Sequence, residues 1–419
     1  MNVLWITNIV FPEAMTKLLG PSELKSSGGW MLAAANALTK RDEIKLYVAS
    51  VSSIVSSLTR IEGDSITYYI IPLGAGNLKE NNEYQQHWRS INDEIHPDIV
   101  HIHGTEFSHG YEYMKVCGVD NVVISIQGLK SEISEYYLAG LSKWEVYKNL
   151  TIRDFIKGSI LREQREFRRS SKYETKMLQM AKHIIGRTSW DKIHSQSVNP
   201  DVKYFFCNES LREEFYDGAL WNIRNCHRYT IFLSQAGYPI KGLHQVLKAM
   251  PFILRKYPTT KIRIAGTDIT QSSSLNNLIR LRGYGLYLKR LMARLGLLEK
   301  VSFLGDLNAE EMKQEYMSCN VFICPSSIEN SPNSLSEAQI LGVPCVASYV
   351  GGIPDMMTGD EENLYRFEDI QMLASKICQI FENENLQTYH MSKVAKARHD
   401  YEFNTTNLLN IYKNIVKEC

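Results

Sequence analysis

Residues 326–345 read SSIENSPNSLSEAQILGVPC and overlap the end of an apolar run, NVFICPS, that has the composition of a buried strand. The Ser/Pro/Asn segment is typical of a loop, a helix is expected to begin near Ser334, and Val343 to Ser348 return as a strand. In a parallel sheet, the loop between a strand and the following helix lies at the carboxyl edge, where open α/β folds bind ligands. The stretch therefore predicts an α/β fold with a ligand site at this loop.

The alternation of strands and helices continues along the chain and indicates βαβ units. The apolar runs of the first half are NVLWITNIV, IKLYVAS, SITYYIIPL, PDIVHIHG and NVVISIQG, and those after residue 228 are YTIFLSQ, KIRIAG, VSFLG, NVFICPS and PCVAS. A length of 419 residues exceeds what one hydrophobic core usually covers. We therefore expect two α/β lobes of the same class, with a charged helical region at residues 130–180 between them.

The composition argues against several classes of protein. A net charge of +1 offers no general field for nucleic acid, and the eight cysteines show neither a CxxC pair nor the spacing of zinc ligands. The opening MNVLWITNIVF has the pattern of a first strand rather than of a signal peptide, and no run reaches the roughly 18 apolar residues of a membrane span. We expect a cytoplasmic protein with reduced cysteines that binds no nucleic acid.

Glu329 and Glu337 lie eight residues apart in the quoted stretch and allow two interpretations. In the first, Ser334 and Glu337 form a capping box, in which each side chain satisfies a backbone N–H group at the start of the helix. In the second, the free N–H groups of the helix start bind a pyrophosphate, Glu337 accepts hydrogen bonds from ribose hydroxyls, and Glu329 meets a second polyol. The spacing alone leaves both interpretations open.

The segment ENSPNSLSEAQILGVP, followed by VGGIP, resembles the E-x7-E signature of family-four glycosyltransferases, which are retaining enzymes of the GT-B fold. Other short motifs of the family agree in order and position: Gly28-Gly29, HPDIVHIHG around His103, Lys241-Gly242, Gly266 in IAG, and Gly305 in VSFLGDL. The resemblance covers nearly the whole chain. It implies an α/β fold of the GT-B type, in which two Rossmann-like lobes have parallel sheets that face a central cleft.

With this fold, residues 1–202 would form an N-terminal, acceptor-binding lobe that includes the basic helical region 130–180. Residues 203–400 would form a C-terminal lobe that binds the nucleotide-sugar. The last residues, 401–419, have apolar positions at helical spacing and are expected to form a helix that packs back on the N-terminal lobe.

The resemblance also implies roles for individual residues of the C-terminal lobe. Glu329 is expected to contact hydroxyls of the donor sugar as a catalytic residue, and Glu337 is expected to bind the nucleotide ribose. The Lys241 ammonium would pair with the donor diphosphate. The diphosphate would also accept hydrogen bonds from the backbone N–H groups of Asn333, Ser334 and Leu335.

In the N-terminal lobe, His103 ends a predicted strand and matches a family histidine near the donor sugar that is assigned to transition-state stabilisation. It is the second catalytic candidate, and His101 is expected on the opposite face of the strand. Gly28 and Gly29 would let the backbone approach the phosphate or the acceptor closely.

Two positions depart from the family pattern. Ser234-Gln235 stands where the family usually has Gly-Arg, so a charge that binds phosphate is missing and donor binding depends more heavily on Lys241. Gln127-Gly128 stands where the family often has His-Gly, so the family pattern does not define the acceptor-side chemistry near Gln127.

The resemblance implies a front-face substitution, in which the departing phosphate oxygen accepts the proton of the acceptor. Retaining glycosidases instead use two carboxyl groups about 5 to 5.5 Å apart, one of them as nucleophile. Glu329 and Glu337 do not suit that mechanism, because one of them is assigned to the ribose and the helix start. The chain has no D-x-D motif, so we expect neither a metal nor another cofactor, and the nucleotide-sugar is a substrate.

Residues 143–176 contain ten Lys/Arg and five Asp/Glu, a local net charge of +5. Ile152, Phe155, Ile156 and Ile160 fall on one helical face. Either this face packs in a core and the charges are solvated, or the helix lies at an anionic lipid surface. The second interpretation predicts peripheral contact with an anionic membrane and suits a polyprenyl-diphosphate-linked acceptor at the inner face of the cell membrane.

We therefore expect a retaining hexosyltransferase that moves a sugar from a nucleotide-sugar donor to a glycan or lipid-linked acceptor, in capsule, exopolysaccharide or lipopolysaccharide synthesis. Two alternatives remain. A nucleotide-sugar epimerase of the same fold would need no second substrate, and a non-catalytic nucleotide-sugar-binding subunit would be consistent with Ser234-Gln235 and Gln127. A nicotinamide-dependent dehydrogenase fits less well, because no G-x-G-x-x-G follows the first strand.

Overall fold

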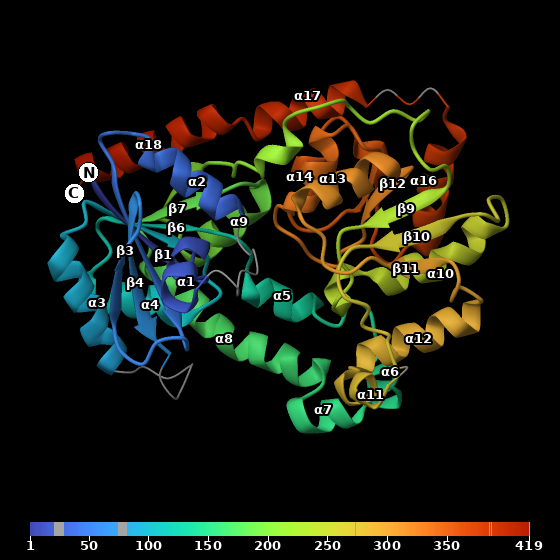
Figure 1. Ribbon diagram of the computed structural model, residues 1–419, viewed down its shortest axis with the longest axis horizontal. Coiled ribbons are helices and arrows are strands. Elements are labelled where there is room, and N and C mark those ends of the chain that lie inside the picture. Colours follow the sequence, from blue (N-terminus) through green and yellow to red (C-terminus); the bar gives the residue numbers. More distant parts are fainter. Residues whose placement is uncertain (21–28, 74–81, 273, 385, 387, 419) are drawn as a thin grey trace. The chain divides into compact units, whose positions relative to one another are not determined.

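The structure is a computed structural model that describes residues 1–419 apart from 21–28, 74–81, 273, 385, 387 and 419 (Figure 1). The chain divides into two compact units. The first unit comprises Met1–Ser131, Arg168–Arg212 and His399–Cys419, and the second comprises Glu132–Phe167 and Glu213–Arg398. In the described part of the chain, no helix combines the length and the apolar character needed to cross a membrane.

The first unit is built on an eight-stranded sheet in the order β3-β4-β2-β1-β5-β6-β7-β8. Its strands are β1 (Asn2–Thr7), β2 (Lys45–Ser52), β3 (Thr59–Glu62), β4 (Ile66–Pro72), β5 (Ile99–His103), β6 (Val122–Ser125), β7 (His183–Gly186) and β8 (Lys203–Phe206). All neighbours are parallel except β3 and β4. The winding direction reverses between β1 and β5, which makes their carboxyl ends the expected ligand site of this sheet.

Helices cover both faces of the first sheet. They are α1 (Pro12–Leu19), α2 (Gly29–Thr39), α3 (Asn82–Ile95), α4 (Ser108–Cys117), α9 (Ser189–Val198) and α18 (Tyr401–Glu418). Two further helices, α5 (Lys130–Tyr136) and α8 (Ile160–Met180), run from one unit into the other.

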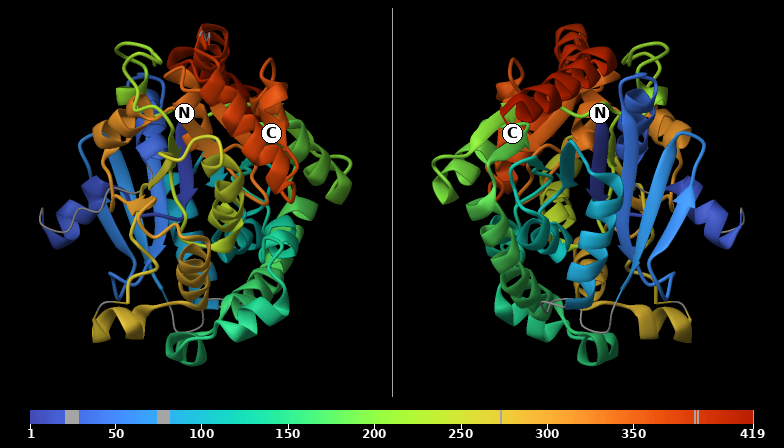
Figure 2. Two further views of the ribbon diagram at one scale, coloured as in Figure 1. Left: turned by 90° about the vertical axis from the view of Figure 1, so that its right-hand side faces the viewer. Right: turned by 90° about the vertical axis from the view of Figure 1, so that its left-hand side faces the viewer.

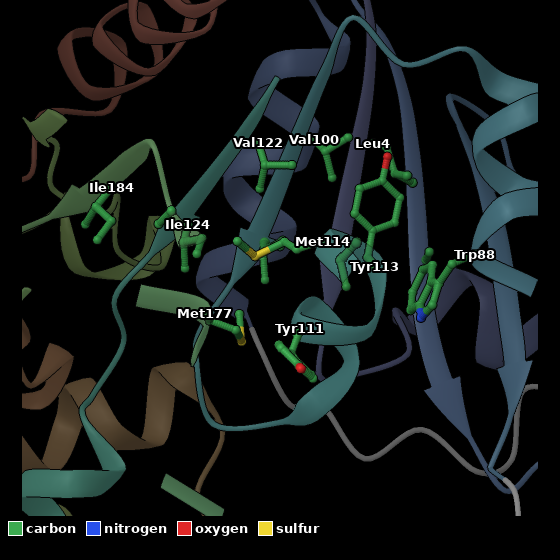
Figure 3. Packing of buried hydrophobic residues seen from close by; sticks show 14 of the residues in the cluster. Leu4, Trp88, Val100, Tyr111, Tyr113, Met114, Val122, Ile124, Met177 and Ile184 are labelled. Carbon is green, nitrogen blue, oxygen red and sulfur yellow. The ribbon is translucent and has the colours of Figure 1, made fainter. Parts of the chain in front are cut away.

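The strand period of two distributes the apolar side chains over both faces of the sheet. Leu4 and Ile6 of β1 pack in one buried cluster, and Trp5 packs in the other. In the first cluster the rings of Trp88 and Tyr113 meet edge to face, with centroids 5.7 Å apart (Figure 3). The sheet is therefore buried on both sides, as expected for a parallel sheet.

The second unit has a six-stranded, fully parallel sheet in the order β11-β10-β9-β12-β13-β14. Its strands are β9 (Thr230–Leu233), β10 (Lys261–Ile264), β11 (Val301–Phe303), β12 (Val321–Cys324), β13 (Cys345–Ser348) and β14 (Leu364–Tyr365). In chain order this is 3-2-1-4-5-6, the arrangement of doubly wound dinucleotide-binding sheets. The winding reverses between β9 and β12.

Ten helices of the described chain accompany this sheet. They are α6 (Lys143–Lys148), α7 (Ile152–Lys157), α10 (Leu243–Leu254), α11 (Leu275–Arg280), α12 (Gly283–Leu295), α13 (Ala309–Ser318), α14 (Asn333–Ile340), α15 (Ile353–Met356), α16 (Ile370–Glu382) and α17 (Tyr389–Arg398). Short 3-10 turns span Glu213–Phe215, Pro239–Lys241 and Glu361–Asn363. In the core, the Tyr316 ring lies edge to face against Phe232 of β9 and Phe322 of β12.

The α/β class with two parallel-sheet lobes is confirmed, and the division into units differs in detail from the expected boundaries at 202 and 400. Residues 132–167 belong to the second unit, because α6 contacts α12 and α7 contacts α11. Residues 203–212 belong to the first unit, where β8 completes the sheet. The terminal helix α18 contacts α2 and β5 of the first unit.

Candidate active site

The quoted stretch 326–345 follows β12 at the point where the second sheet reverses its winding. Lys241 comes from the 3-10 turn after β9, and Glu329 comes from the loop after β12. The loop leads directly into α14, which begins at Asn333. Residues from the two strands that flank the switch point are thereby brought to one edge of the sheet.

Lys241 and Glu329 form an ion pair, with Lys241 Nζ 2.5 Å from Glu329 Oε1. Each side chain is 15% exposed. The Ser326 hydroxyl donates a hydrogen bond to the same carboxylate oxygen at 2.8 Å. Burial lowers the pKa of Lys241, but the Glu329 carboxylate and Tyr238 together raise it above its ordinary value. Lys241 is therefore a cation held beside a carboxylate in a nearly enclosed place.

Two glycines set the spacing of the loops around this pair. Gly242 has φ +69°, and a Cβ there would lie 1.7 Å from the carbonyl oxygen of Pro325. Gly351 has φ +52°, and a Cβ there would lie 1.9 Å from the carbonyl oxygen of Glu329. Both positions require a residue without a side chain. The loops after β9, β12 and β13 therefore pack on one another through their backbones.

The start of α14 contradicts the capping box that the sequence allowed. The N-cap is Pro332, which makes no side-chain cap, and Ser334 lies one residue inside the helix. The Leu335 N–H donates to the Pro332 carbonyl at 3.0 Å. Asn333 and Ser334 are the two residues of the helix that come before Leu335. The first N–H groups of a helix have no intrahelical acceptor and suit an anion.

Glu337 lies in the second turn of α14 and is 5% exposed. The Tyr316 hydroxyl of α13 lies 3.4 Å from Glu337 Oε2 and 2.9 Å from the carbonyl oxygen of Ser334. Because the capping box is not formed, Glu337 is a buried carboxylate next to a helix start rather than a cap. The ligand-binding interpretation of the two glutamates stays a prediction.

Gly266 and Gly305 meet at the ends of β10 and β11, where the Gly266 N–H donates to the Gly305 carbonyl at 2.7 Å. Ser234 and Gln235 directly follow β9, and Gln235 is exposed. These two residues bring no charge to the edge that carries Lys241.

In the first unit, His103 ends β5 at the switch point between β1 and β5, and it is 5% exposed. Its ring stacks on His101 with centroids 3.9 Å apart and lies 4.3 Å from the Trp5 ring. Burial lowers the pKa of His103 to about 3, so the ring is neutral at physiological pH. The expectation that His101 lies on the opposite face was wrong, because residues two apart in a strand share a face.

Sequence reasoning did not find the network beside His103. Arg187 Nη1 lies 2.8 Å from Glu209 Oε2, the Gln127 amide donates to Glu209 Oε1 at 2.8 Å, and Arg187 donates to Gln127 Oε1 at 3.1 Å. These side chains and both histidines line a cavity of about 50 Å³, which is enough for a few water molecules. The available signal was a charged residue shortly after an apolar strand, in HIIGR and YFFCNE.

Glu106 was also missed. It follows β5 by three residues. Burial first, and then the Glu174 carboxylate, raise the pKa of Glu106 to about 7, although Lys130 and Arg187 act in the opposite direction. The first unit therefore carries a carboxyl group that titrates near neutral pH at its carboxyl edge.

Gly28 lies outside the described residues, and Gly29 is the first residue of α2. In the described part of the chain, no cluster of histidine, cysteine, aspartate and glutamate side chains has the geometry of a metal site. The donor-site candidates of the second unit thus lie around one loop system, and His103 belongs to the other unit.

The sequence and the fold both resemble those of known proteins. Residues 222–398 match the family described as "Glycosyl transferases group 1". An uncharacterized glycosyltransferase of Methanocaldococcus jannaschii is 24% identical over 226 residues, which are 53% of this chain and 53% of the relative. The chain therefore spans about half the length of this curated relative.

Solved structures match over the whole chain. Sucrose-phosphate synthase from Thermosynechococcus elongatus has a TM-score of 0.71 at 14% identity, with 100% of both chains covered. Anabaena HepE in complex with UDP-glucose has a TM-score of 0.62 at 13% identity, with 99% of this chain and all of HepE covered. The chain thus has the two-sheet GT-B fold of these solved structures, and its residues 222–398 are similar to the group 1 glycosyl transferases.

Proposed function

We propose that the protein transfers a hexose from a nucleotide-sugar donor to a glycan or lipid-linked acceptor, with retention of the anomeric configuration. The observation that carries this proposal is the Lys241–Glu329 pair, held by Gly242 and Gly351 beside the start of α14. This cluster lies at the switch point of the sheet whose residues match the group 1 glycosyl transferases.

The cluster would offer partners for the diphosphate, the ribose and the sugar of the donor. The diphosphate would accept hydrogen bonds from the N–H groups at the start of α14 and would pair with the Lys241 ammonium. Glu337 would accept hydrogen bonds from the ribose hydroxyls, and Glu329 from hydroxyls of the sugar. The structure of HepE was solved in complex with UDP-glucose, which supports a nucleotide-sugar as the ligand class.

The reaction would break the bond between the anomeric carbon and the diphosphate oxygen and form a bond from that carbon to an acceptor oxygen on the same face. The acceptor's proton passes to the departing diphosphate oxygen. Charge that develops on the diphosphate is stabilised by Lys241 and by the fixed N–H groups, which act without reorganisation. Neutral His103 would stabilise the transition state through its ring rather than as a cation.

We infer that the acceptor is a growing glycan or a polyprenyl-diphosphate-linked sugar of a cell-surface polysaccharide. A second candidate function, a nucleotide-sugar-binding subunit without turnover, is favoured by one observation, because Ser234 and Gln235 supply no second cation for the diphosphate. Binding and turnover must therefore be measured separately.

The test is a thermal-shift screen with UDP-, GDP-, ADP- and TDP-sugars, followed by measurement of nucleotide release. We expect one nucleotide-sugar to stabilise the wild type, because the ligand binds the native state. Glu337→Ala should lose this stabilisation, because it removes the proposed contact with the ribose. Glu310→Ala, at an exposed position of α13, is the matched control and should respond as the wild type does. Stabilisation without release of nucleotide would favour the binding subunit, and no stabilisation would contradict both candidates.

A further inference from the structure

Helices α6 and α7 turn five large apolar side chains toward solvent, and each exposes 57% to 77% of its surface. We name this set the α6–α7 surface: Trp144, Tyr147, Ile152, Phe155 and Ile156. The arrangement differs from the single helical face expected from the sequence. Gly158, at φ +97°, ends α7, and Ile160 is buried. Five large apolar side chains exposed within residues 144–156 are typical of a site of interaction.

The opposite side of these helices is anchored to the rest of the second unit. Asp154 Oδ2 accepts a hydrogen bond from the Gly283 N–H at 2.9 Å, and Arg290 donates to the Lys148 carbonyl at 3.0 Å. In Figure 1, α6 lies beside α12 and α7 beside α11, in agreement with their contacts, and both views of Figure 2 have this segment at the bottom. The apolar side chains are therefore the outer face of a packed structure.

The charge that this segment presents to solvent is positive. Its two carboxylates, Glu145 and Asp154, accept hydrogen bonds from the N–H groups of their own N-cap residues at 2.8 and 3.0 Å. Both therefore complete capping boxes and are turned to the backbone. Within residues 143–157 the exposed charged side chains are Lys143, Lys148 and Lys157, and Arg153 is half-buried.

We propose that the α6–α7 surface binds the interface of an anionic lipid bilayer. The aromatic and aliphatic side chains enter the boundary between headgroups and acyl chains, and the lysines extend to the lipid phosphates. Charge complementarity favours this occupant over a protein partner, because the lysines lie on the same two short helices as the rings. The inference concerns a surface of the second unit alone and does not rest on the proposed transferase activity.

The test is co-sedimentation of the 419-residue chain with vesicles of phosphatidylcholine alone or mixed with phosphatidylglycerol. We expect binding to the mixed vesicles that weakens at high salt. Two triple variants should each bind about a hundredfold more weakly. The first removes apolar side chains, Trp144→Ser/Phe155→Ser/Ile156→Ser, and the second removes charges, Lys143→Ser/Lys148→Ser/Lys157→Ser.

Matched controls distinguish binding through this surface from non-specific binding to lipid. Ile193→Ser/Tyr389→Ser/Phe403→Ser removes three similarly exposed apolar residues from other helices, and Lys40→Ser/Lys261→Ser/Lys393→Ser removes the same charge from other positions. Both controls should bind as the wild type does. Equal binding by the patch variants, or equal losses in the controls, would overturn the proposal.

A second measurement does not depend on how well the triple variants fold. Brominated lipid in the mixed vesicles should quench the fluorescence of Trp144, and Trp144→Phe should keep binding while losing most of this quenching. Unchanged quenching in Trp144→Phe would overturn the proposal. So would a dimer in sedimentation velocity that the apolar triple variant abolishes, because a second copy would then occupy the surface.

Discussion

Lys241 and Glu329 form a nearly enclosed ion pair, so removal of one partner leaves a charge without compensation. We expect Lys241→Ala to lower the free energy of unfolding of the second unit by about 3 kcal/mol. The double variant Lys241→Ala/Glu329→Ala should recover part of this loss. Urea unfolding of the wild type, Lys241→Ala, Glu329→Ala and the double variant measures the coupling. A single variant as stable as the wild type would contradict the ion pair.

Glu106 makes the stability of the first unit depend on pH. Its pKa of about 7 lies above the ordinary 4.5, so the folded state prefers the protonated carboxyl. The contribution to stability is complete below about pH 4.5 and is lost as the pH rises through about 7. We expect Glu106→Gln to remove this decline in stability. Its melting temperature should approach that of the wild type at low pH and exceed it near pH 8. Parallel curves would contradict the prediction.

At this scale the sequence identified residues but not their partners. Glu329 and Glu337 lie within one loop and helix, so their spacing could be read locally, whereas the contact between Lys241 and Glu329 joins the segments that follow two different strands. The capping box was wrong because the helix begins before Ser334. The Arg187–Glu209 contact could not be predicted, since it joins loops after β7 and β8.

Among the structural elements, the loops around Lys241 depend on glycine for two separate reasons, the left-handed φ and the close backbone contact. Gly296, at φ +68°, has the same conformation as Gly242, but a Cβ added there would meet no atom within 4 Å, so it separates the two effects. We expect Gly296→Ala to cost about 1 kcal/mol and Gly242→Ala at least about 2 kcal/mol more. Equal losses in thermal or urea unfolding would show that the Pro325 contact relaxes freely.

The elements themselves were predictable where the apolar runs were long. The runs NVLWITNIV, IKLYVAS and PDIVHIHG correspond to β1, β2 and β5. The four-residue β7, HIIG, was missed because only two of its residues are apolar. The two-residue β14 is too short to carry a periodic signal. The basic region was expected as one amphipathic segment and consists of α5 to α8, because interruptions such as Gly140 and Gly158, both at positive φ, end the individual helices.

For the whole molecule, each unit has its own sheet and its own buried clusters. Large proteins with separate cores commonly depart from two-state unfolding. We expect two thermal transitions. A bound nucleoside diphosphate should raise the melting temperature of the second unit, since Lys241, Glu337 and the start of α14 lie there. Differential scanning calorimetry with and without ligand measures this, and a single transition that shifts as one would contradict it.

The fold class followed from the sequence because alternating strands and helices admit few arrangements. The assignment of residues 132–167 did not, since it depends on contacts between α6 and α12 and between α7 and α11, which no local pattern encodes.

The most direct test of the donor site is calorimetric titration of UDP, GDP, ADP and TDP into the wild type, Glu337→Ala and Glu310→Ala. We predict that one of them binds the wild type and the Glu310→Ala control equally, and binds Glu337→Ala at least about tenfold more weakly, a difference of about 1.4 kcal/mol. Equal affinity in Glu337→Ala, or no binding of any of the four to the wild type, would contradict a nucleotide site at the start of α14.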